Sequence, residues 1–285
     1  MRESVIYESP MSTEVGLSAT MRLIERYGMT EPPFSLSPDP RYLYMTPQHT
    51  RALAHLRFTI DDRAGLAVLY GDVGHGKSTI VRRLFDLYRD APDYNAILLT
   101  NPDQSTALQL LKRVTDLCGL DRRATKLDQM RELEDHLVEQ FKDGKNVVML
   151  VDEAQLLHGP QFELIRQLTN FESSRSKLVQ IILVGQNNLR NKLRLNKALL
   201  SRAAAVSTLD PLTPDETREM IEFRLRVAGR TVPLFEPETI TEIHRLTKGV
   251  PRDIVKRCRV ALIVAAMNQL DTIPPEALED GASET

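Results

Sequence analysis

The sequence has little of several features that would point to particular classes of protein. Only two cysteines, Cys118 and Cys258, occur among its 285 residues, and their wide separation excludes a metal or redox motif built on paired cysteines. No apolar run approaches the length of a membrane span, and the amino terminus lacks the pattern of a signal peptide. Internal repeats and low-complexity tracts are absent as well. Together these absences favour a cytoplasmic globular protein.

An excess of either charge is also missing. The 37 Lys and Arg residues and the 39 Asp and Glu residues give a net charge of −2 at pH 7. The chain therefore has no global basic signature for nucleic acid, although a local basic patch would suffice for binding. Hydrophobic residues make up 42% and charged residues 27% of the sequence, which is typical of a globular protein. The length is enough for one large or two modest domains.

What the sequence does contain is the pattern of a phosphate-binding loop, G-x-x-x-x-G-K-[ST]. An apolar run of strand type, residues 66–70, precedes the loop, and an apolar stripe at helical spacing follows it. The glycines let backbone N–H groups converge on phosphate oxygens, and the positive end of the following helix points at the same anion. The alternative, a chance match in a glycine-containing turn, is disfavoured by this context and by a second motif downstream. The residues predicted to bind the nucleotide are Gly71, Asp72, Val73, Gly74, His75, Gly76, Lys77, Ser78 and Thr79.

Two of these residues and a later acidic pair are expected to act on ATP and Mg²⁺. Lys77 can reach the β- and γ-phosphates, and Ser78 can ligate Mg²⁺. The second motif is the apolar run 147–151 followed by Asp152 and Glu153. At the carboxyl edge of a parallel sheet these acids would face the phosphate loop, Asp152 to hold Mg²⁺ and Glu153 to orient an attacking water. Without the upstream loop, they could equally be an exposed pair that opens a loop.

Three further residues are candidates for sensing or stabilising the γ-phosphate. Gln186, with Asn187 as the alternative, follows an apolar run and could position the water, although a polar turn after a strand has the same pattern. Arg202 precedes another apolar run, and Arg252 opens a predicted helix. A guanidinium can spread over developing phosphate charge without deprotonating. A surface position without a role is the alternative for each arginine.

Apolar runs alternate with segments of helical spacing, which predicts an α/β fold with a five-stranded parallel sheet covered by helices on both faces. The predicted strands are residues 66–70, 96–99, 147–151, 178–184 and 203–209. From Asp210 onward the pattern is helical, and it opens with a capping box at Thr213–Glu216. We therefore expect four parts. They are an arm over residues 1–30, a nucleotide-binding α/β domain over 31–210, a small helical domain over 211–270 and a disordered acidic tail over 271–285.

With these motifs in place, the sequence resembles the AAA+ ATPases of the ExeA-like group. The resemblance covers about residues 34–266. Besides the phosphate loop, the resemblance rests on four segments: Pro33–Pro40, Val151–Gln155, Leu183–Gln186 and Gly249–Arg252. It implies that Gln186 is sensor 1, that Arg202 is an arginine finger acting on the neighbouring subunit's nucleotide, and that Arg252 is sensor 2 on a helical lid. Gln186-Asn187-Asn188 stands where the group usually has Gln-Pro-Glu.

Proteins of this architecture serve different processes. Some ExeA-like proteins assist secretion or pilus assembly, and these usually carry a transmembrane helix and a wall-binding domain, which we do not find in the sequence. Others, similar to TnsC, TniB, IstB and MuB, assemble on DNA and recruit a transposase or a target selector. We expect the second role, in a homo-oligomer that forms a ring or a helical filament on double-stranded DNA. An ATP switch that binds only protein partners is a third possibility.

The distribution of charge gives this expectation local support. Between Glu172 and Asp210 there is no acidic residue. Seven basic residues lie there: Arg175, Lys177, Arg190, Lys192, Arg194, Lys197 and Arg202. We expect the group from Arg190 to Lys197 at subunit contacts. In the similar transposition regulators, loops in the general region of a second cluster touch the DNA backbone. That cluster, Arg122, Arg123 and Lys126, is therefore expected to contact DNA phosphates, with a solvated basic loop as the alternative.

Overall fold

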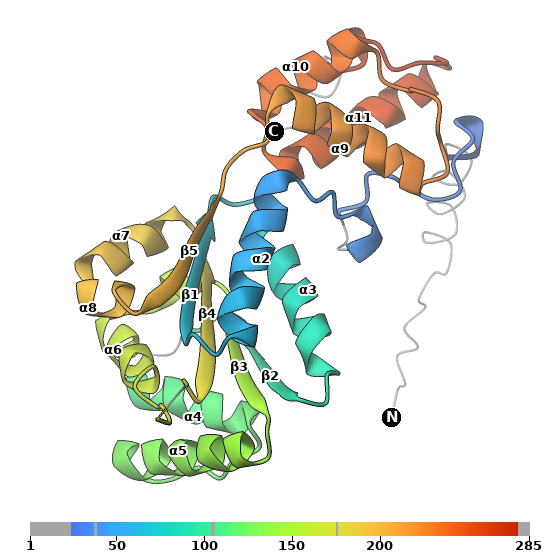
Figure 1. Ribbon diagram of the computed structural model, residues 1–285. Coiled ribbons are helices and arrows are strands. Elements are labelled where there is room, and N and C mark those ends of the chain that lie inside the picture. Colours follow the sequence, from blue (N-terminus) through green and yellow to red (C-terminus); the bar gives the residue numbers. More distant parts are fainter. Residues whose placement is uncertain (1–23, 37–38, 104–105, 175, 279–285) are drawn as a thin grey trace, which may run out of the picture. The chain divides into compact units, whose positions relative to one another are not determined.

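The computed structural model describes residues 24–36, 39–103, 106–174 and 176–278 (Figure 1). The chain divides into two compact units. One unit, which we call the sheet unit, is Met45–Asp210. The other, the helical unit, combines the residues up to Tyr44 with those from Pro211 onward. Nowhere in the described ranges does a helix combine the length and the apolar character needed to span a membrane.

The sheet unit is built on a five-stranded parallel sheet with the strand order β2-β3-β4-β1-β5. This confirms the predicted fold class. The strands are β1 (Leu66–Gly71), β2 (Tyr94–Leu99), β3 (Asn146–Val151), β4 (Val179–Gly185) and β5 (Ala203–Leu209). β1, β3 and β4 are buried along their whole length. Strands covered on both faces are mostly apolar, which explains the apolar runs in the sequence. The polar exceptions, Asn146 of β3 and Gln180 of β4, hydrogen-bond each other at 3.1 Å.

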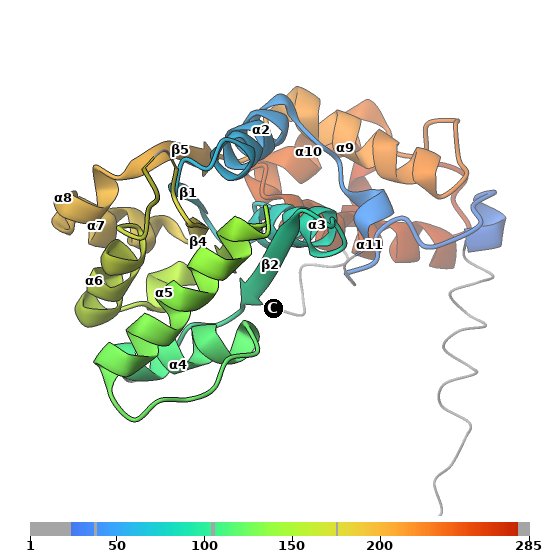
Figure 2. The same ribbon diagram turned by 60° about the horizontal axis from the view of Figure 1, so that its bottom comes forward.

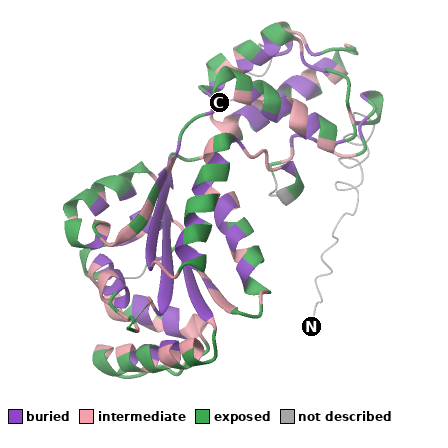
Figure 3. Cartoon of the chain, in the orientation of Figure 1, coloured by how far each residue is buried: buried purple, intermediate pink, exposed green. Residues whose placement is uncertain are grey.

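Helices cover both faces of the sheet, as Figure 1 shows. On one face lie α2 (Pro47–Asp61) and α3 (Lys77–Arg89). The helices of the other face are α4 (Ala107–Leu117), α5 (Lys126–Lys142), α6 (Gly159–Leu168), α7 (Asn187–Leu195) and α8 (Lys197–Leu200). A short 3-10 helix, η2 (Ala154–Leu156), follows β3. α4 and α5 lie side by side (Figure 2). Figure 3 shows buried strands between helices whose outer sides are exposed.

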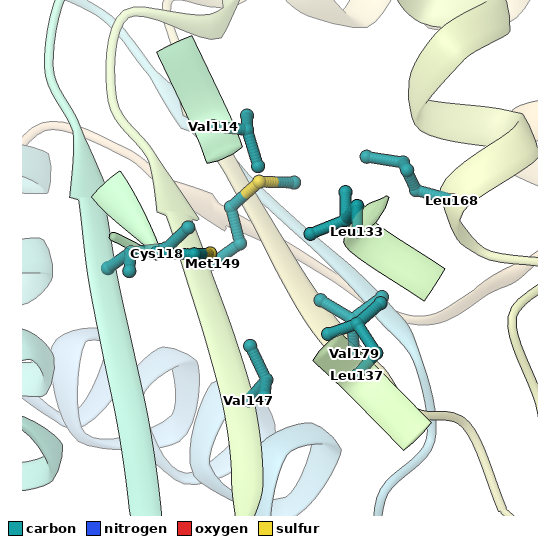
Figure 4. Close-up of a pocket in the computed structure, with 9 residues that line it drawn as sticks. Val114, Cys118, Leu133, Leu137, Val147, Met149, Leu168 and Val179 are labelled. Atoms are coloured by element: carbon teal, nitrogen blue, oxygen red, sulfur yellow. The ribbon is translucent and has the colours of Figure 1, made fainter. Parts of the chain in front are cut away.

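The core under α4 and α5 contains one small apolar void (Figure 4). Its volume is about 10 Å³, at the lower limit for one water molecule, and its lining offers no polar partner for water. The residues around it are Ile97, Val114, Cys118, Leu133, Leu137, Val147, Met149, Leu168 and Val179. Burial raises the pKa of the Cys118 thiol to about 11, so this cysteine stays protonated at neutral pH and serves in packing.

The helical unit packs three helices around its own core. They are α9 (Pro214–Val227), α10 (Pro237–Thr247) and α11 (Pro251–Met267). α9 begins at the capping box predicted from the sequence: the Thr213 hydroxyl accepts a hydrogen bond from the N–H of Glu216, whose carboxylate accepts one from the N–H of Thr213. The sequence pattern of caps and helix-ending glycines therefore predicted this part well.

The proline-rich segment before Met45 belongs to the helical unit, whereas we expected residues 31–44 in the nucleotide-binding domain. The reason is Arg224 of α9, which is 9% exposed. Its guanidinium donates to the carbonyl oxygens of Pro33, Ser35 and Tyr42 at 2.8–3.3 Å. The ring of Phe34 also packs edge-on against Phe235, with 5.7 Å between centroids. A segment of irregular backbone thus finds its polar and apolar partners on α9 and beside α10.

Both ends of the chain also differ from the expectation where they are described. A disordered tail was predicted from residue 271, but Ile273 exchanges backbone hydrogen bonds with Leu234 and Glu236, and η3 (Pro275–Leu278) buries Ala277 and Leu278. Within the predicted arm, Ile24 and Tyr27 are buried in the same core. Disorder of the tail was predicted because it contains two prolines and several acidic residues. Residues 1–23 and 279–285 lie outside the described part.

Candidate nucleotide site

The loop between β1 and α3 has a backbone that glycine adopts most easily. Gly74 and Gly76 have φ angles of 86° and 87°, in the left-handed region. At Gly71, a Cβ atom would lie 2.5 Å from the carbonyl oxygen of Leu209 on β5, so a side chain would push the loop away from that strand. Gly76 is the N-cap of α3, and no side chain caps this helix. The first N–H groups of α3 are therefore available to an anion.

Two histidines that we had not assigned this role hold the loop in place. The side chain of His75 is buried, and its Nδ1 donates to the carbonyl oxygen of Leu209 at 2.9 Å. The carbonyl oxygen of His75 lies 3.1 Å from Nε2 of His49 on α2. Nδ1 of His49 lies 2.6 Å from the Thr46 hydroxyl. Because a carbonyl can only accept, Nε2 of His49 carries the proton. The loop is thus anchored to α2 on one side and to β5 on the other.

Lys77 is almost fully buried at the start of α3. It is 6% exposed, and its Nζ donates to the carbonyl oxygen of Asp72 at 2.8 Å. Burial lowers the pKa of Lys77, and the charges of Glu153, Asp152 and Asp72 partly oppose this effect. A buried ammonium that is incompletely compensated favours an anion beside it. The polyphosphate of a nucleotide would supply that anion.

The acids that follow β3 lie beside this lysine. Asp152 accepts a hydrogen bond from the backbone N–H of Glu153 at 2.9 Å and one from the hydroxyl of Ser78. Burial nevertheless raises the pKa of Asp152. Glu153 has a φ angle of 55°, which is uncommon for a residue with a side chain. Such strain is tolerated where a side chain must be held in one direction.

The oxygen atoms of Ser78 and Asp152 fit the requirements of Mg²⁺. This ion prefers hydroxyl, carboxylate, phosphate and water oxygens, and it usually takes only one or two protein ligands in nucleotide sites. In keeping with this, no cluster of three or more His, Cys, Asp or Glu side chains that could hold a metal occurs among the described residues. A cation beside Asp152 would also relieve the cost of burying its carboxylate. The pair therefore suits an ion that is shared with substrate phosphates.

Gln186 at the end of β4 faces Glu153. Its Nε2 lies 3.4 Å from Oε2 of Glu153, a long hydrogen bond. Asn187, the alternative candidate, is exposed as the first residue of α7. Gln155, for which the sequence suggested no function, lies between the two strands' ends: its amide donates to Glu153 and accepts from the backbone N–H of Gln186. The structure thus brings together the acid and the sensor candidate.

Arg202 lies at the opposite end of the sheet from the loop of its own subunit. It directly precedes β5, whose first residue pairs with Leu66 at the start of β1, whereas the loop follows Gly71 at the end of β1. Five residues of a strand separate these ends by about 17 Å. Its charge adds instead to the effect of Lys177, whose hydrogen bond is the main reason that the pKa of Glu172 is lowered. Arg202 therefore lies out of reach of the phosphate loop in its own chain.

The other arginine candidates have different surroundings. Arg190 on α7 stacks over the ring of Tyr70, with 5.6 Å between its guanidinium carbon and the ring centroid. Arg194 is exposed on the same helix. Arg252 is exposed in the first turn of α11, in the helical unit. Arg175 lies outside the described residues.

The residues expected to contact DNA each have a polar partner on the protein. Arg122 pairs with Asp116 at 2.7 Å, and Arg123 pairs with Glu132 at 2.8 Å. Nζ of Lys126 donates to the side chain of Gln167 at 3.2 Å. Both arginines remain exposed, and exposed ion pairs are weak. A phosphate could replace the carboxylates, but the cluster is less positive than its sequence suggests.

Comparison with known proteins agrees with this site. A family model described as an AAA domain matches residues 60–193, a range that contains the loop, both acids and Gln186. The chain therefore carries an AAA domain. General secretion pathway protein A of Aeromonas hydrophila is 40% identical to it over 243 residues, which are 84% of this chain and 44% of that protein. The predicted enzyme class of this domain, an ATP hydrolase, is thereby confirmed, and the chain spans less than half the length of that relative.

Solved structures show the same fold for the AAA+ domain. The ORC2 protein of Aeropyrum pernix, solved as ADPNP and ADP complexes, has a TM-score of 0.63 and 17% identity, covering 88% of this chain and 71% of its own. The ORC1 protein of the same organism, solved in complex with DNA, has a TM-score of 0.62 and 16% identity, covering 89% and 69%. At this level of identity the likeness concerns the fold alone.

Proposed function

We propose that this protein binds ATP with Mg²⁺, assembles into a homo-oligomer and hydrolyses ATP at sites completed by a neighbouring subunit. One observation carries the proposal: a buried lysine, the uncapped amino end of α3 and the pair Asp152 and Glu153 meet at one edge of the sheet. Burial disfavours the charged forms of Lys77 and Asp152, and Mg²⁺ with a triphosphate would compensate both while the amino end of α3 binds phosphate oxygens.

The residues of this chain have separate tasks in the proposed reaction. Lys77 and the N–H groups of the loop hold the β- and γ-phosphates, while Ser78 and Asp152 hold Mg²⁺, which withdraws charge from the phosphate oxygens when bound. Glu153 orients a water and takes its proton as the water oxygen bonds to the γ-phosphorus. The bond from that phosphorus to the oxygen that stays with ADP breaks. Arg202 of the neighbouring subunit stabilises the developing charge.

Replacing Lys77 tests the binding step. Lys77→Ala should abolish binding of a fluorescent ATP analogue, because the phosphates lose their main side-chain cation and the loop N–H groups alone are too weak. Lys142→Ala, at an exposed lysine in the last turn of α5, is the matched control and should bind as the wild type does. Binding by Lys77→Ala with unchanged affinity would contradict the assignment of the loop.

As the biological role, we propose that the assembly forms on double-stranded DNA and recruits a transposase or a target selector. The acid-free span from 173 to 209 and the cluster of exposed Arg122 and Arg123 with half-buried Lys126 support a DNA contact. The fold shared with an ORC1 protein solved with DNA is compatible with it.

A different observation favours a second biological role, in secretion or pilus assembly. The 40% identity to General secretion pathway protein A is far above the identity to the DNA-bound ORC1. An ATPase that assists secretion or pilus assembly would share the nucleotide chemistry described above but would not need DNA. A measurement of ATP-dependent binding to DNA therefore distinguishes the two proposed roles.

A further inference from the structure

Gln155 occupies a position between the reacting acid and the sensor strand. It lies in η2, directly after β3, and it is 5% exposed. Its Nε2 donates to Oε2 of Glu153, and its Oε1 accepts from the backbone N–H of Gln186 at 3.0 Å. One side chain thus joins two segments that are 31 residues apart in the sequence.

The orientation of this amide is determined by its partners. A backbone N–H can only donate, so the oxygen of Gln155 must face Gln186. The nitrogen must then face the carboxylate of Glu153, which can only accept. An uncharged donor holds the carboxylate in place without the strong loss of basicity that a lysine or arginine would cause. This suits a group whose task is to take a proton.

The surrounding backbone is shaped for Gln155. A Cβ atom at Gly185 would lie 2.6 Å from Oε1 of Gln155 and 2.9 Å from a methyl group of Leu189. Glycine at the end of β4 therefore lets the amide approach. Lys192 of α7 adds a second tie, because its Nζ donates to the carbonyl oxygens of Gln155 and Leu157 at 2.5 and 2.9 Å. The segment η2 is thus fixed to β4 and α7 through both its side chain and its main chain.

We propose that Gln155 is a positioning residue for ATP hydrolysis. It holds the carboxylate of Glu153 and the main chain of Gln186 in a fixed relative arrangement, so that the attacking water is aligned with the γ-phosphate. The inference rests on the proposed function. A small displacement of a reacting group can reduce the rate by about 10²-fold. Gln155 acts through Glu153 and Gln186 and does not contact the substrate itself.

Gln155→Met is the first test, because methionine keeps the volume and removes both hydrogen bonds. We expect kcat for ATP hydrolysis to fall by about 10- to 100-fold, with little change in affinity for the fluorescent ATP analogue. Gln129→Met is the matched control: Gln129 is buried and also accepts from a backbone N–H, that of Arg123, while it donates to Thr115 and Asp121 far from the acid. The control should keep kcat within about twofold, since it lacks any tie to Glu153.

Gln155→Glu distinguishes positioning from a structural role. The introduced glutamate keeps an acceptor for the backbone N–H of Gln186 but replaces the N–H donor to Glu153 with a second carboxylate, which repels it. We therefore expect kcat for ATP hydrolysis to fall as in Gln155→Met, while the affinity for the fluorescent ATP analogue stays near that of the wild type.

The outcomes separate the inference from the proposed function. A wild-type chain that does not hydrolyse ATP would overturn the proposed function, and the inference with it. Wild-type hydrolysis together with an unchanged kcat in Gln155→Met would overturn the inference alone. Equal losses in Gln155→Met and Gln129→Met, or a wild-type kcat in Gln155→Glu, would reduce Gln155 to a packing residue.

Discussion

At the scale of single residues, the candidate site holds charges that the protein would not bury without a ligand. Asp152 is the clearest case, because burial raises its pKa even though Glu153 and Ser78 donate hydrogen bonds to it. Above this raised pKa, the folded state carries a carboxylate that it disfavours. The contribution of Asp152 to the stability of the folded state is complete at pH values below the pKa of Asp152 in the unfolded chain. It is lost as the pH rises through the higher pKa of Asp152 in the folded protein.

Asp152→Asn should therefore stabilise the nucleotide-free protein at pH 7 while it weakens Mg²⁺-dependent hydrolysis. Each kcal/mol gained raises Tm by about 2–4 °C in a protein of this size. This increase in Tm should become smaller as the pH falls through the pKa that Asp152 has in the folded protein, because Asp152 is then neutral in the wild type too. Thermal unfolding at several pH values measures this, and a lower Tm for the variant at pH 7 would contradict the account.

The sequence predicted some residues of the site far better than others. Lys77, Ser78, Asp152 and Glu153 follow a fixed spacing or end an apolar run, so a local pattern finds them. Gln155 was not predicted to act, Lys192 was expected only at subunit contacts, and the anchoring bonds of His49 and His75 were not predicted. Their partners lie 26 to 134 residues away in the chain, and no local pattern records such contacts.

At the scale of elements, the strands were predicted closely and the segment after β4 was not. α7 and α8 are short, and the buried apolar positions of α7, Leu189 and Leu193, are too few to give a clear helical stripe. This segment matters because it carries the chain from Gln186, beside Glu153, to Arg202 at the other end of the sheet. In the proposed oligomer, α7 and α8 would therefore link the sites of two subunits.

Mixing two inactive variants tests that linkage. Arg202→Ala should lower turnover by about 10³-fold or more while ATP binding by the monomer stays near normal, because an arginine finger acts in the transition state. Adding Lys77→Ala protein should restore part of the activity, since some interfaces then pair an intact loop with an intact arginine. Arg131→Ala, at an exposed position of α5, is the control. No complementation under conditions of assembly would count against Arg202 and direct attention to Arg190 and Arg194.

At the scale of the whole molecule, the sequence located the change from sheet to helices after Asp210 but assigned residues 31–44 to the wrong unit. Proline-rich segments lack a period that could assign them, and Arg224, which binds this one, is about 190 residues away in the chain. Packing of this kind is decided by tertiary contacts. The same applies to Ile273, whose backbone partners lie near residue 235.

DNA binding belongs to this scale as well, because an assembly repeats each weak contact. Binding should require an ATP analogue, be largely independent of sequence and weaken steeply with salt. The triple change of Arg122, Arg123 and Lys126 to alanine should reduce the salt slope by about 1 for each phosphate that the variant no longer neutralises. A triple change of Arg82, Arg83 and Arg89 on α3 is the matched control. Absence of DNA binding by the wild type at low salt would favour the role in secretion or pilus assembly.

The most direct test of the central claim is a paired measurement on Glu153→Gln. The account predicts that this variant binds the fluorescent ATP analogue with wild-type affinity and hydrolyses ATP at least about 10²-fold more slowly, because the acid acts in the chemical step and not in binding. Wild-type turnover by Glu153→Gln, measured on protein with confirmed nucleotide binding, would contradict it.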